Sequence, residues 1–136
     1  MQNPPPVQTG KSSTGLDENV AALIAYIFGW LSGLILLLLE KESRLVRFHA
    51  MQSILFNVLI AVIGFVLWIV TFIFVLIASQ IGGFLGTIVG LLATLIWIAF
   101  CIGLLIAWVM CLIKAYQGQF FKLPVIGDFA EKFINK

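Results

Sequence analysis

One uncharged stretch constrains this sequence more than any other feature, because no Asp, Glu, Lys or Arg occurs between Phe48 and Ile113. A transmembrane helix needs about 20 consecutive apolar residues, so this stretch is long enough for at least two crossings. In the whole chain 62% of the residues are hydrophobic and 10% are charged, whereas soluble domains are about half apolar and about a quarter charged. The sequence therefore predicts an all-α, polytopic membrane protein.

Three transmembrane helices are predicted, at about 17–39, 46–79 and 84–114. Acidic Asp17 and Glu18 suit the positive end of the first helix dipole, and Gly82-Gly83 marks the turn between the second and third helices. Residues 17–114 are thus expected to form a transmembrane helical bundle. Four crossings, with a hairpin hidden in the uncharged stretch, remain the less favoured alternative.

The two ends of the chain have different compositions from the bundle. Residues 1–16 are rich in Pro, Gly, Ser and Thr and poor in large apolar residues, which predicts a flexible N-terminal tail. Residues 115–136 are expected to form a cytoplasmic link and an amphipathic helix. Its apolar face would lie flat on the inner leaflet, with docking onto a protein partner as the alternative. This face comprises Ile126, Phe129, Ala130, Phe133 and Ile134.

The basic residues predict an orientation. With three crossings, Lys11 stands alone on one side of the membrane, and the other seven basic residues share the opposite side. Because cytoplasmic loops carry the excess of Lys and Arg, the C-terminus is expected in the cytoplasm and the N-terminus outside. The predicted location is the plasma (inner) membrane. The seven residues are Lys41, Arg44, Arg47, Lys114, Lys122, Lys132 and Lys136.

A polar stripe runs along the start of the second predicted helix. At about 100° per residue, His49, Gln52, Ser53 and Asn57 fall within one arc about 140° wide. Polar side chains inside a membrane face either the bundle interior or an aqueous cavity. Structural hydrogen bonds near the interface are the favoured interpretation. A functional polar pocket and contact with a partner remain open.

Small residues recur at four-residue spacing and predict close helix packing, because helices in lipid associate where their backbones can approach. Packing within the chain is favoured over packing against a partner or a second copy. Basic side chains near the helix ends are expected to contact lipid headgroups or a partner. The packing glycines are Gly29, Gly33, Gly82, Gly86, Gly90 and Gly103, and the basic residues are Arg44, Arg47, Lys122 and Lys132.

No catalytic or ligand-binding motif is present. The sequence contains no Ser-His-Asp arrangement, GxGxxG, P-loop or HExxH motif, and His49 has no Cys, Asp or Glu at metal-ligand spacing. Cys101 and Cys111 are about 15 Å apart on one helix, which is too far for a disulfide. A net charge of +2 is too small to indicate nucleic acid. We therefore expect no enzyme activity, no cofactor and no metal.

The block Arg47-Phe48-His49-Ala50-Met51-Gln52 resembles the chloroplast-import-component-like (Tic-type) family of small membrane proteins. The resemblance covers residues 17–131 and implies a multi-pass membrane protein, most simply an uncharacterised prokaryotic relative. For plastid members it implies a four-helix protein in a preprotein-conducting complex. Further matches are Tyr26-Ile27-Phe28-Gly29-Trp30-Leu31, Leu39-Glu40-Lys41, Ala115, Gly118, Leu123-Pro124, Ile126-Gly127 and Ala130, of which Leu123, Pro124 and Gly127 form a C-terminal motif.

These features predict a non-enzymatic scaffold or accessory subunit of a membrane complex. Its expected partners are the lipid bilayer and either another membrane protein or a second copy of itself. A component of a protein-translocation or small-solute transport assembly, using the polar stripe, is the alternative. A lipid-surface protein acting through the C-terminal helix is a third possibility.

Overall fold

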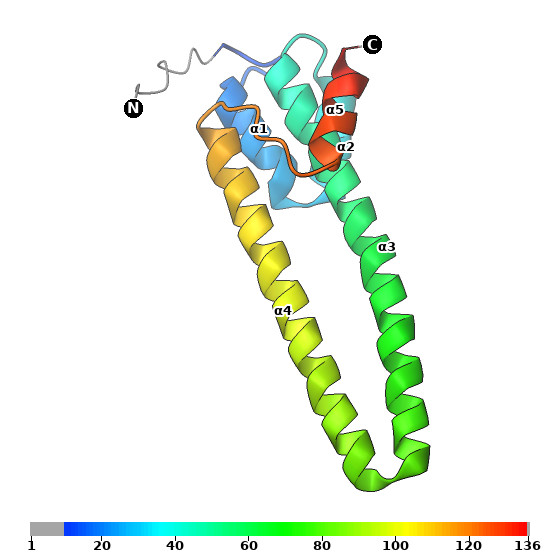
Figure 1. Ribbon diagram of the computed structural model, residues 1–136. Coiled ribbons are helices and arrows are strands. Elements are labelled where there is room, and N and C mark those ends of the chain that lie inside the picture. Colours follow the sequence, from blue (N-terminus) through cyan, green and yellow to red (C-terminus); the bar gives the residue numbers. More distant parts are fainter. Residues whose placement is uncertain (1–9, 136) are drawn as a thin grey trace. The chain divides into compact units, whose positions relative to one another are not determined.

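The computed structural model describes residues 10–135, which are all-helical apart from turns and one isolated backbone bridge between Lys11 and Asp17 (Figure 1). The described residues form two compact units: residues 10–58 with 107–135, called the head here, and Leu59–Ile106, called the hairpin. The helices are α1 (Glu18–Ile27), α2 (Trp30–Leu39), α3 (Arg44–Ile81), α4 (Gly83–Tyr116) and α5 (Ile126–Ile134).

Within the described residues, only α3 and α4 are long and apolar enough to cross a membrane. They contain 38 and 34 residues, and each extends two residues beyond its predicted C-terminal end. The predicted crossing at residues 17–39 is not confirmed. In its place the structure has α1 and α2, two helices of 10 residues each.

The break between α1 and α2 occurs at Gly29, whose φ of 62° lies in the region that favours glycine. The Ser32 hydroxyl donates a hydrogen bond to the Ala25 carbonyl at 3.1 Å and accepts one from the Phe28 amide at 3.2 Å. These bonds satisfy backbone groups that the missing helical turn leaves free. The prediction of one continuous helix was wrong because the chain turns back at this glycine.

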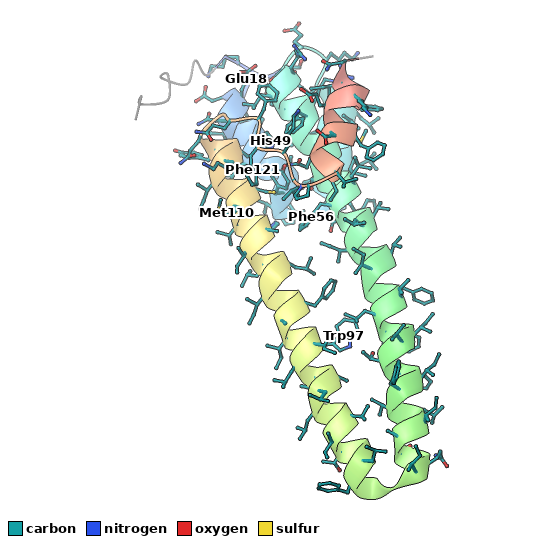
Figure 2. All side chains as sticks on the ribbon, viewed as in Figure 1. Glu18, His49, Phe56, Trp97, Met110 and Phe121 are labelled. Atoms are coloured by element: carbon teal, nitrogen blue, oxygen red, sulfur yellow. The ribbon has the colours of Figure 1, made fainter. Side chains whose placement is uncertain are left out.

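The hairpin consists of the second part of α3 and the first part of α4. Its sequence contains no charged residue, and its large apolar side chains are mostly exposed. Figure 2 shows Trp97 projecting from α4 toward α3, where its indole N–H donates to the Thr71 hydroxyl at 3.3 Å. An exposed apolar surface of this kind, with backbone bonds satisfied inside each helix, suits a lipid environment.

Two apolar clusters pack the head. One cluster joins α1, α2 and α3 through residues that include three alanines, which allow the helix backbones to approach closely. A second cluster joins α5 to α3. The first contains Ala21, Ala25, Leu36, Val46 and Ala50, and the second contains Phe48, Ala130 and Ile134 with Met51 and Leu55 packed against it.

The C-terminal helix differs from its predicted placement. Ala130 and Ile134 are buried against α3, while Phe129 and Phe133 of the predicted apolar face remain exposed. The face expected to lie flat on the inner leaflet is therefore divided between protein contact and the surface. The start of α5 needs a glycine, because a Cβ at position 127 would lie 2.4 Å from the Lys122 Cβ.

Part of the predicted flexible tail is folded. The Ser12 amide donates to the Leu16 carbonyl at 2.8 Å, and the Gly15 amide donates to the Ser12 carbonyl at 2.9 Å. Ser13 is fastened to Glu40 by two hydrogen bonds. The prediction for residues 1–9 lies outside the described residues, whereas residues 12–16 form a turn that the Glu40 carboxylate binds.

A candidate functional site on the polar stripe of α3

Three of the four predicted stripe residues, His49, Gln52 and Ser53, are fully buried in the head. They project from the first part of α3 toward α1, toward the turn between α1 and α2, and toward the link after α4. Asn57, the fourth, lies one turn further along and is partly exposed. The site is therefore built from three segments that are distant in the sequence.

His49 connects two of these segments. Its Nδ1 lies 2.8 Å from the Tyr26 hydroxyl of α1, and its Nε2 lies 2.7 Å from the Gln119 carbonyl oxygen. Because a carbonyl only accepts, the hydrogen belongs on Nε2, and Nδ1 accepts from the Tyr26 hydroxyl. Both ring nitrogens of a neutral imidazole are thus satisfied.

Gln52 binds the same tyrosine and the same link. Its Nε2 donates to the Tyr26 hydroxyl and to the Phe121 carbonyl, both at 2.9 Å, and its Oε1 accepts from the Leu123 amide at 3.0 Å. Residues 119–123 are therefore held to α3 by hydrogen bonds to their backbone. We call Tyr26, His49 and Gln52 with these backbone partners the polar clamp.

Ser53 and Asn57 lie at the break between α1 and α2. The Ser53 hydroxyl donates to the Gly29 carbonyl at 3.0 Å. The Asn57 amide instead donates to the Ser53 carbonyl of its own helix at 2.9 Å. Ser53 therefore stabilises the turn at which the chain reverses between α1 and α2. Asn57 makes no hydrogen bond to the polar clamp.

Tyr26 is the member of the polar clamp that the sequence did not identify as a site residue. It is buried, its ring meets the His49 ring edge-on with centroids 5.5 Å apart, and the indole N–H of Trp108 on α4 donates to its carbonyl at 2.9 Å. The only sequence signal for Tyr26 was its place in a motif quoted for the family resemblance. Nothing in the spacing of residues 26 and 49 indicates contact.

Glu40, also missed, forms a second polar cluster at the end of α2. Only 2% of its surface is exposed. Its carboxylate accepts from the Ser13 amide at 2.8 Å, the Ser13 hydroxyl at 2.7 Å, the Ser43 amide at 2.9 Å and the Glu42 amide at 3.1 Å. Burial alone would raise the pKa of Glu40, but these four hydrogen bonds outweigh it and lower the pKa below its ordinary value.

Three of the four basic residues predicted to contact headgroups make contacts within the head. Arg44 donates to the Asn135 side chain, and Lys122 pairs with Glu131. The hydrogen bond to Glu131 raises the pKa of Lys122. Lys132 lies over the Phe129 ring, 5.7 Å from its centroid, whereas the Nε of Arg47 is buried without a hydrogen-bond partner among residues 10–135.

The predicted packing glycines divide into two groups. A Cβ at Gly33 would lie 2.9 Å from the Ala50 carbonyl oxygen, and one at Gly86 would lie 3.1 Å from the Ser79 Cα. Gly29 similarly approaches Asn57. Gly82, Gly90 and Gly103 have no neighbouring atom within 4 Å of an added Cβ, so they are open in this chain.

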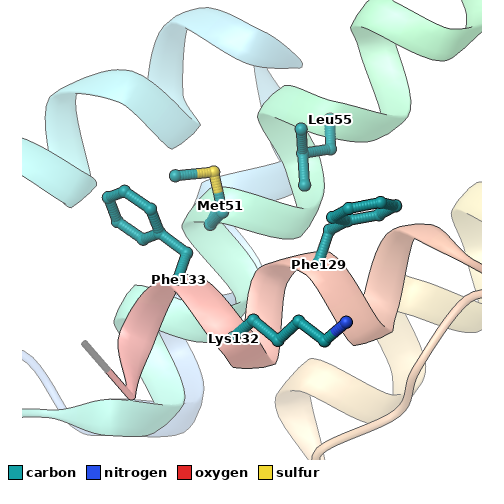
Figure 3. Close-up of a pocket in the computed structure, with 5 residues that line it drawn as sticks. All are labelled: Met51, Leu55, Phe129, Lys132 and Phe133. Atoms are coloured by element: carbon teal, nitrogen blue, oxygen red, sulfur yellow. The ribbon is translucent and has the colours of Figure 1, made fainter.

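A shallow apolar groove lies between α3 and α5 (Figure 3). Met51 and Leu55 line it from α3, and Phe129, Lys132 and Phe133 line it from α5. Across residues 10–135, no three His, Cys, Asp or Glu side chains come together in a group that could hold a metal.

Comparisons with known proteins identify relatives along most of the chain. Residues 16–130 match the magnetosome magnetite crystal formation protein family. A UPF0132 membrane protein of Methanocaldococcus jannaschii is 40% identical over 124 residues, which cover 91% of this chain and 94% of that protein. One from Archaeoglobus fulgidus is 41% identical over 120 residues, covering 88% of this chain and 98% of that protein. No solved structure matches the chain.

These matches correct the family resemblance drawn from the sequence. The Tic-type assignment, which rested on short motifs such as Arg47 to Gln52, was wrong, because the family match and the curated relatives point elsewhere. The relatives are named membrane proteins, in agreement with the apolar helices. The chain belongs to the magnetosome magnetite crystal formation protein family.

Proposed function

We propose that this protein is a non-enzymatic scaffold or accessory subunit of a membrane complex, located in the plasma membrane with its C-terminal helix on the cytoplasmic side. The observation that carries the proposal is the polar clamp. His49 and Gln52 are fully buried, and the nitrogen and oxygen atoms of both side chains are hydrogen-bonded within the chain. The polar chemistry of the head thus fixes its shape.

Two surfaces support contact with partners. In the head, exposed Phe129 and Phe133 adjoin the charged side chains of α5, a combination that suits a protein interface near the membrane. In the hairpin, Gly90 and Gly103 leave the α4 backbone open to a neighbouring helix. The family's printed name refers to magnetite crystal formation, and a scaffold at a membrane is compatible with that name.

Photo-crosslinking in cells tests the proposal. A photoreactive amino acid at Gly90, on the open face of α4, should give a reproducible adduct with another membrane protein or a second copy. The matched control is Leu92, which lies two residues along the same helix and is exposed. Because two residues rotate a helix by about 200°, Leu92 points away from Gly90 and should give a different pattern.

The outcome that contradicts the scaffold is equally definite. If Gly90, Leu92 and Phe129 yield no adduct beyond lipid, and the detergent-solubilised protein is only a lone monomer, the protein has no stable partner. Adducts of equal yield at Gly90 and Leu92 would indicate random collisions in the membrane. Either result overturns the proposal.

The polar stripe does not favour the transport alternative. A hydrated path needs polar side chains that face water, whereas His49, Gln52 and Ser53 have no exposed surface in the head. The scaffold is therefore the one function proposed.

A further inference from the structure

We propose that α1 and α2 form a re-entrant helix pair. The pair contacts the lipid of the cytoplasmic leaflet and returns to the side of the membrane from which it entered. The membrane is then crossed twice, by α3 and α4, and both ends of the chain are cytoplasmic. This inference does not depend on the scaffold role, and it replaces the orientation expected from three crossings.

The two ends of the α1–α2 segment meet in the head. The Ser13 amide and hydroxyl donate to the Glu40 carboxylate at 2.8 and 2.7 Å, and the Lys41 amide donates to the Ser13 hydroxyl at 3.2 Å. A segment that crossed the membrane between these residues would separate them by the hydrocarbon core, which is about 30 Å thick. Hydrogen bonds between its two ends are incompatible with such a crossing.

Further hydrogen bonds in the head bring the starts of α1 and α3 close to the ends of α4 and α5. The Asn19 amide near the start of α1 donates to the Tyr116 carbonyl at the end of α4 at 3.0 Å, and Arg44 at the start of α3 binds Asn135 after α5. Figure 1 shows the start of α1, the connection from α2 to α3 and the end of α5 together. The start of α1, the start of α3, the end of α4 and the end of α5 thus lie together in the head.

The tip of the α1–α2 pair is apolar on its surface. Phe28 is 74% exposed and Trp30 is 55% exposed, and each helix of 10 residues is about 15 Å long, half of the hydrocarbon thickness. Exposed leucines continue this surface along α2 at Leu31, Leu34, Leu38 and Leu39. Two short apolar helices of this length suit one leaflet.

The polar backbone at this tip is satisfied by protein, as a non-helical turn in lipid requires. The Gly29 carbonyl accepts from the Ser53 hydroxyl at 3.0 Å. The Tyr26 carbonyl accepts from the Trp108 indole at 2.9 Å. The turn can therefore enter apolar surroundings without leaving these carbonyls unpaired.

The charge distribution sets the direction of entry. All eight Lys and Arg residues lie outside residues 59–106, so the Gly82 turn and the helix ends beside it carry no charge. With both ends on one side, Lys11 joins the other seven basic residues, so the positive-inside rule has no exception and places this side in the cytoplasm. Anionic headgroups of that leaflet complement the same charges.

The hairpin of α3 and α4, Leu59–Ile106, is long enough for two membrane crossings. Its parts of α3 and α4, residues 59–81 and 83–106, are each about 35 Å long at 1.5 Å per residue. This length matches a hydrocarbon core of about 30 Å with a modest tilt. The uncharged Gly82 turn would then emerge on the outer side.

Single-cysteine labelling tests the inference. Cys101 and Cys111 are replaced by Ala, and Thr14→Cys, Lys41→Cys or Gln80→Cys is introduced one at a time, each at an exposed residue. Intact cells and inverted vesicles are then treated with a membrane-impermeant maleimide. Thr14→Cys and Lys41→Cys should label only in inverted vesicles, and Gln80→Cys only in intact cells. Labelling of Thr14→Cys in intact cells would contradict the re-entrant path of α1 and α2.

A second measurement leaves both native cysteines in place. A green fluorescent protein fused to the N-terminus folds in the cytoplasm but fails to become fluorescent after unfolded export. We expect membrane-bound fluorescence from both N-terminal and C-terminal fusions. A dark, full-length N-terminal fusion beside a fluorescent C-terminal fusion would place the N-terminus outside and contradict the proposal.

Discussion

The Tyr26 hydroxyl lies 2.8 Å from the His49 Nδ1 and joins α1 to α3 inside the head. The same hydroxyl accepts a hydrogen bond from Gln52 at 2.9 Å. One phenol thus makes hydrogen bonds to two residues of the stripe. Both of these residues also bond the backbone of the link that leads to α5. The stability of the head should depend on this small set of side chains.

Replacing Gln52 should destabilise the protein strongly. Gln52→Leu leaves the buried Leu123 amide and the Phe121 carbonyl without their partner, and an unpaired buried polar group costs about 1–3 kcal/mol. We expect a loss of about 2–4 kcal/mol in the free energy of unfolding, measured by denaturant titration in detergent micelles. Asn57→Leu is the control, because Asn57 bonds only its own helix, and it should cost less. Equal losses would argue against the polar clamp.

The polar clamp also predicts that two substitutions are not additive. Tyr26→Phe and Gln52→Leu each remove the hydrogen bond that joins these side chains, so the second change has less to lose. The double variant should be more stable than the sum of the single effects predicts by about 0.5–2 kcal/mol. A double-mutant cycle in the same micelles measures this difference, and strict additivity would show that the two residues act independently.

The sequence predicted the periodic part of the site and missed the part formed by tertiary contact. Helical periodicity placed His49, Gln52 and Ser53 on one face because that relation is local. Their partners include a tyrosine 23 residues before His49 and the carbonyl of Gln119, 70 residues after it. Backbone acceptors carry no side-chain signature, so no pattern identifies them.

The fold shows the same division. The uncharged stretch gave α3 and α4 to within a few residues at their ends, because length and hydropathy are properties of the segment itself. The break at Gly29 could not be inferred, since Gly33 lies within the helix of the same apolar segment. What separates the two glycines is the positive φ of Gly29 and its contacts with Ser53 and Asn57.

Gly33 and Gly90 should respond oppositely to the same substitution. In Gly33→Ala the new methyl group meets the Ala50 carbonyl oxygen at 2.9 Å, whereas nothing lies within 4 Å at Gly90. Forcing atoms into a packed contact costs about 1–3 kcal/mol, against a helix-propensity gain of about 1 kcal/mol for Ala over Gly. Thermal unfolding should show Gly33→Ala below the parent and Gly90→Ala at or above it. The reverse order would contradict the packing described here.

Acid should weaken the connection between the N-terminal turn and α2. The pKa of Glu40 is lower in the folded protein than its ordinary value, so its stabilising contribution is complete above the ordinary pKa and is lost as the pH falls through the folded pKa. Glu40→Gln should flatten the decline in stability below about pH 4.3, the ordinary Glu pKa. Unfolding measured from pH 7 to pH 3 checks this, and parallel curves for parent and Glu40→Gln would contradict it.

Ser53 offers a test that separates a packed stripe from a water-filled path. Ser53→Cys changes only oxygen to sulfur at a residue with no exposed surface, so its thiol should stay unreactive toward a membrane-impermeant maleimide in both intact cells and inverted vesicles. In the background with Ala at Cys101 and Cys111, Gln80→Cys near the exposed end of α3 is the control and should react. Denaturation of the labelled sample should then expose the Ser53→Cys thiol, which proves that it was present and free. Reaction before denaturation would mean that water reaches the stripe, as the transport alternative requires.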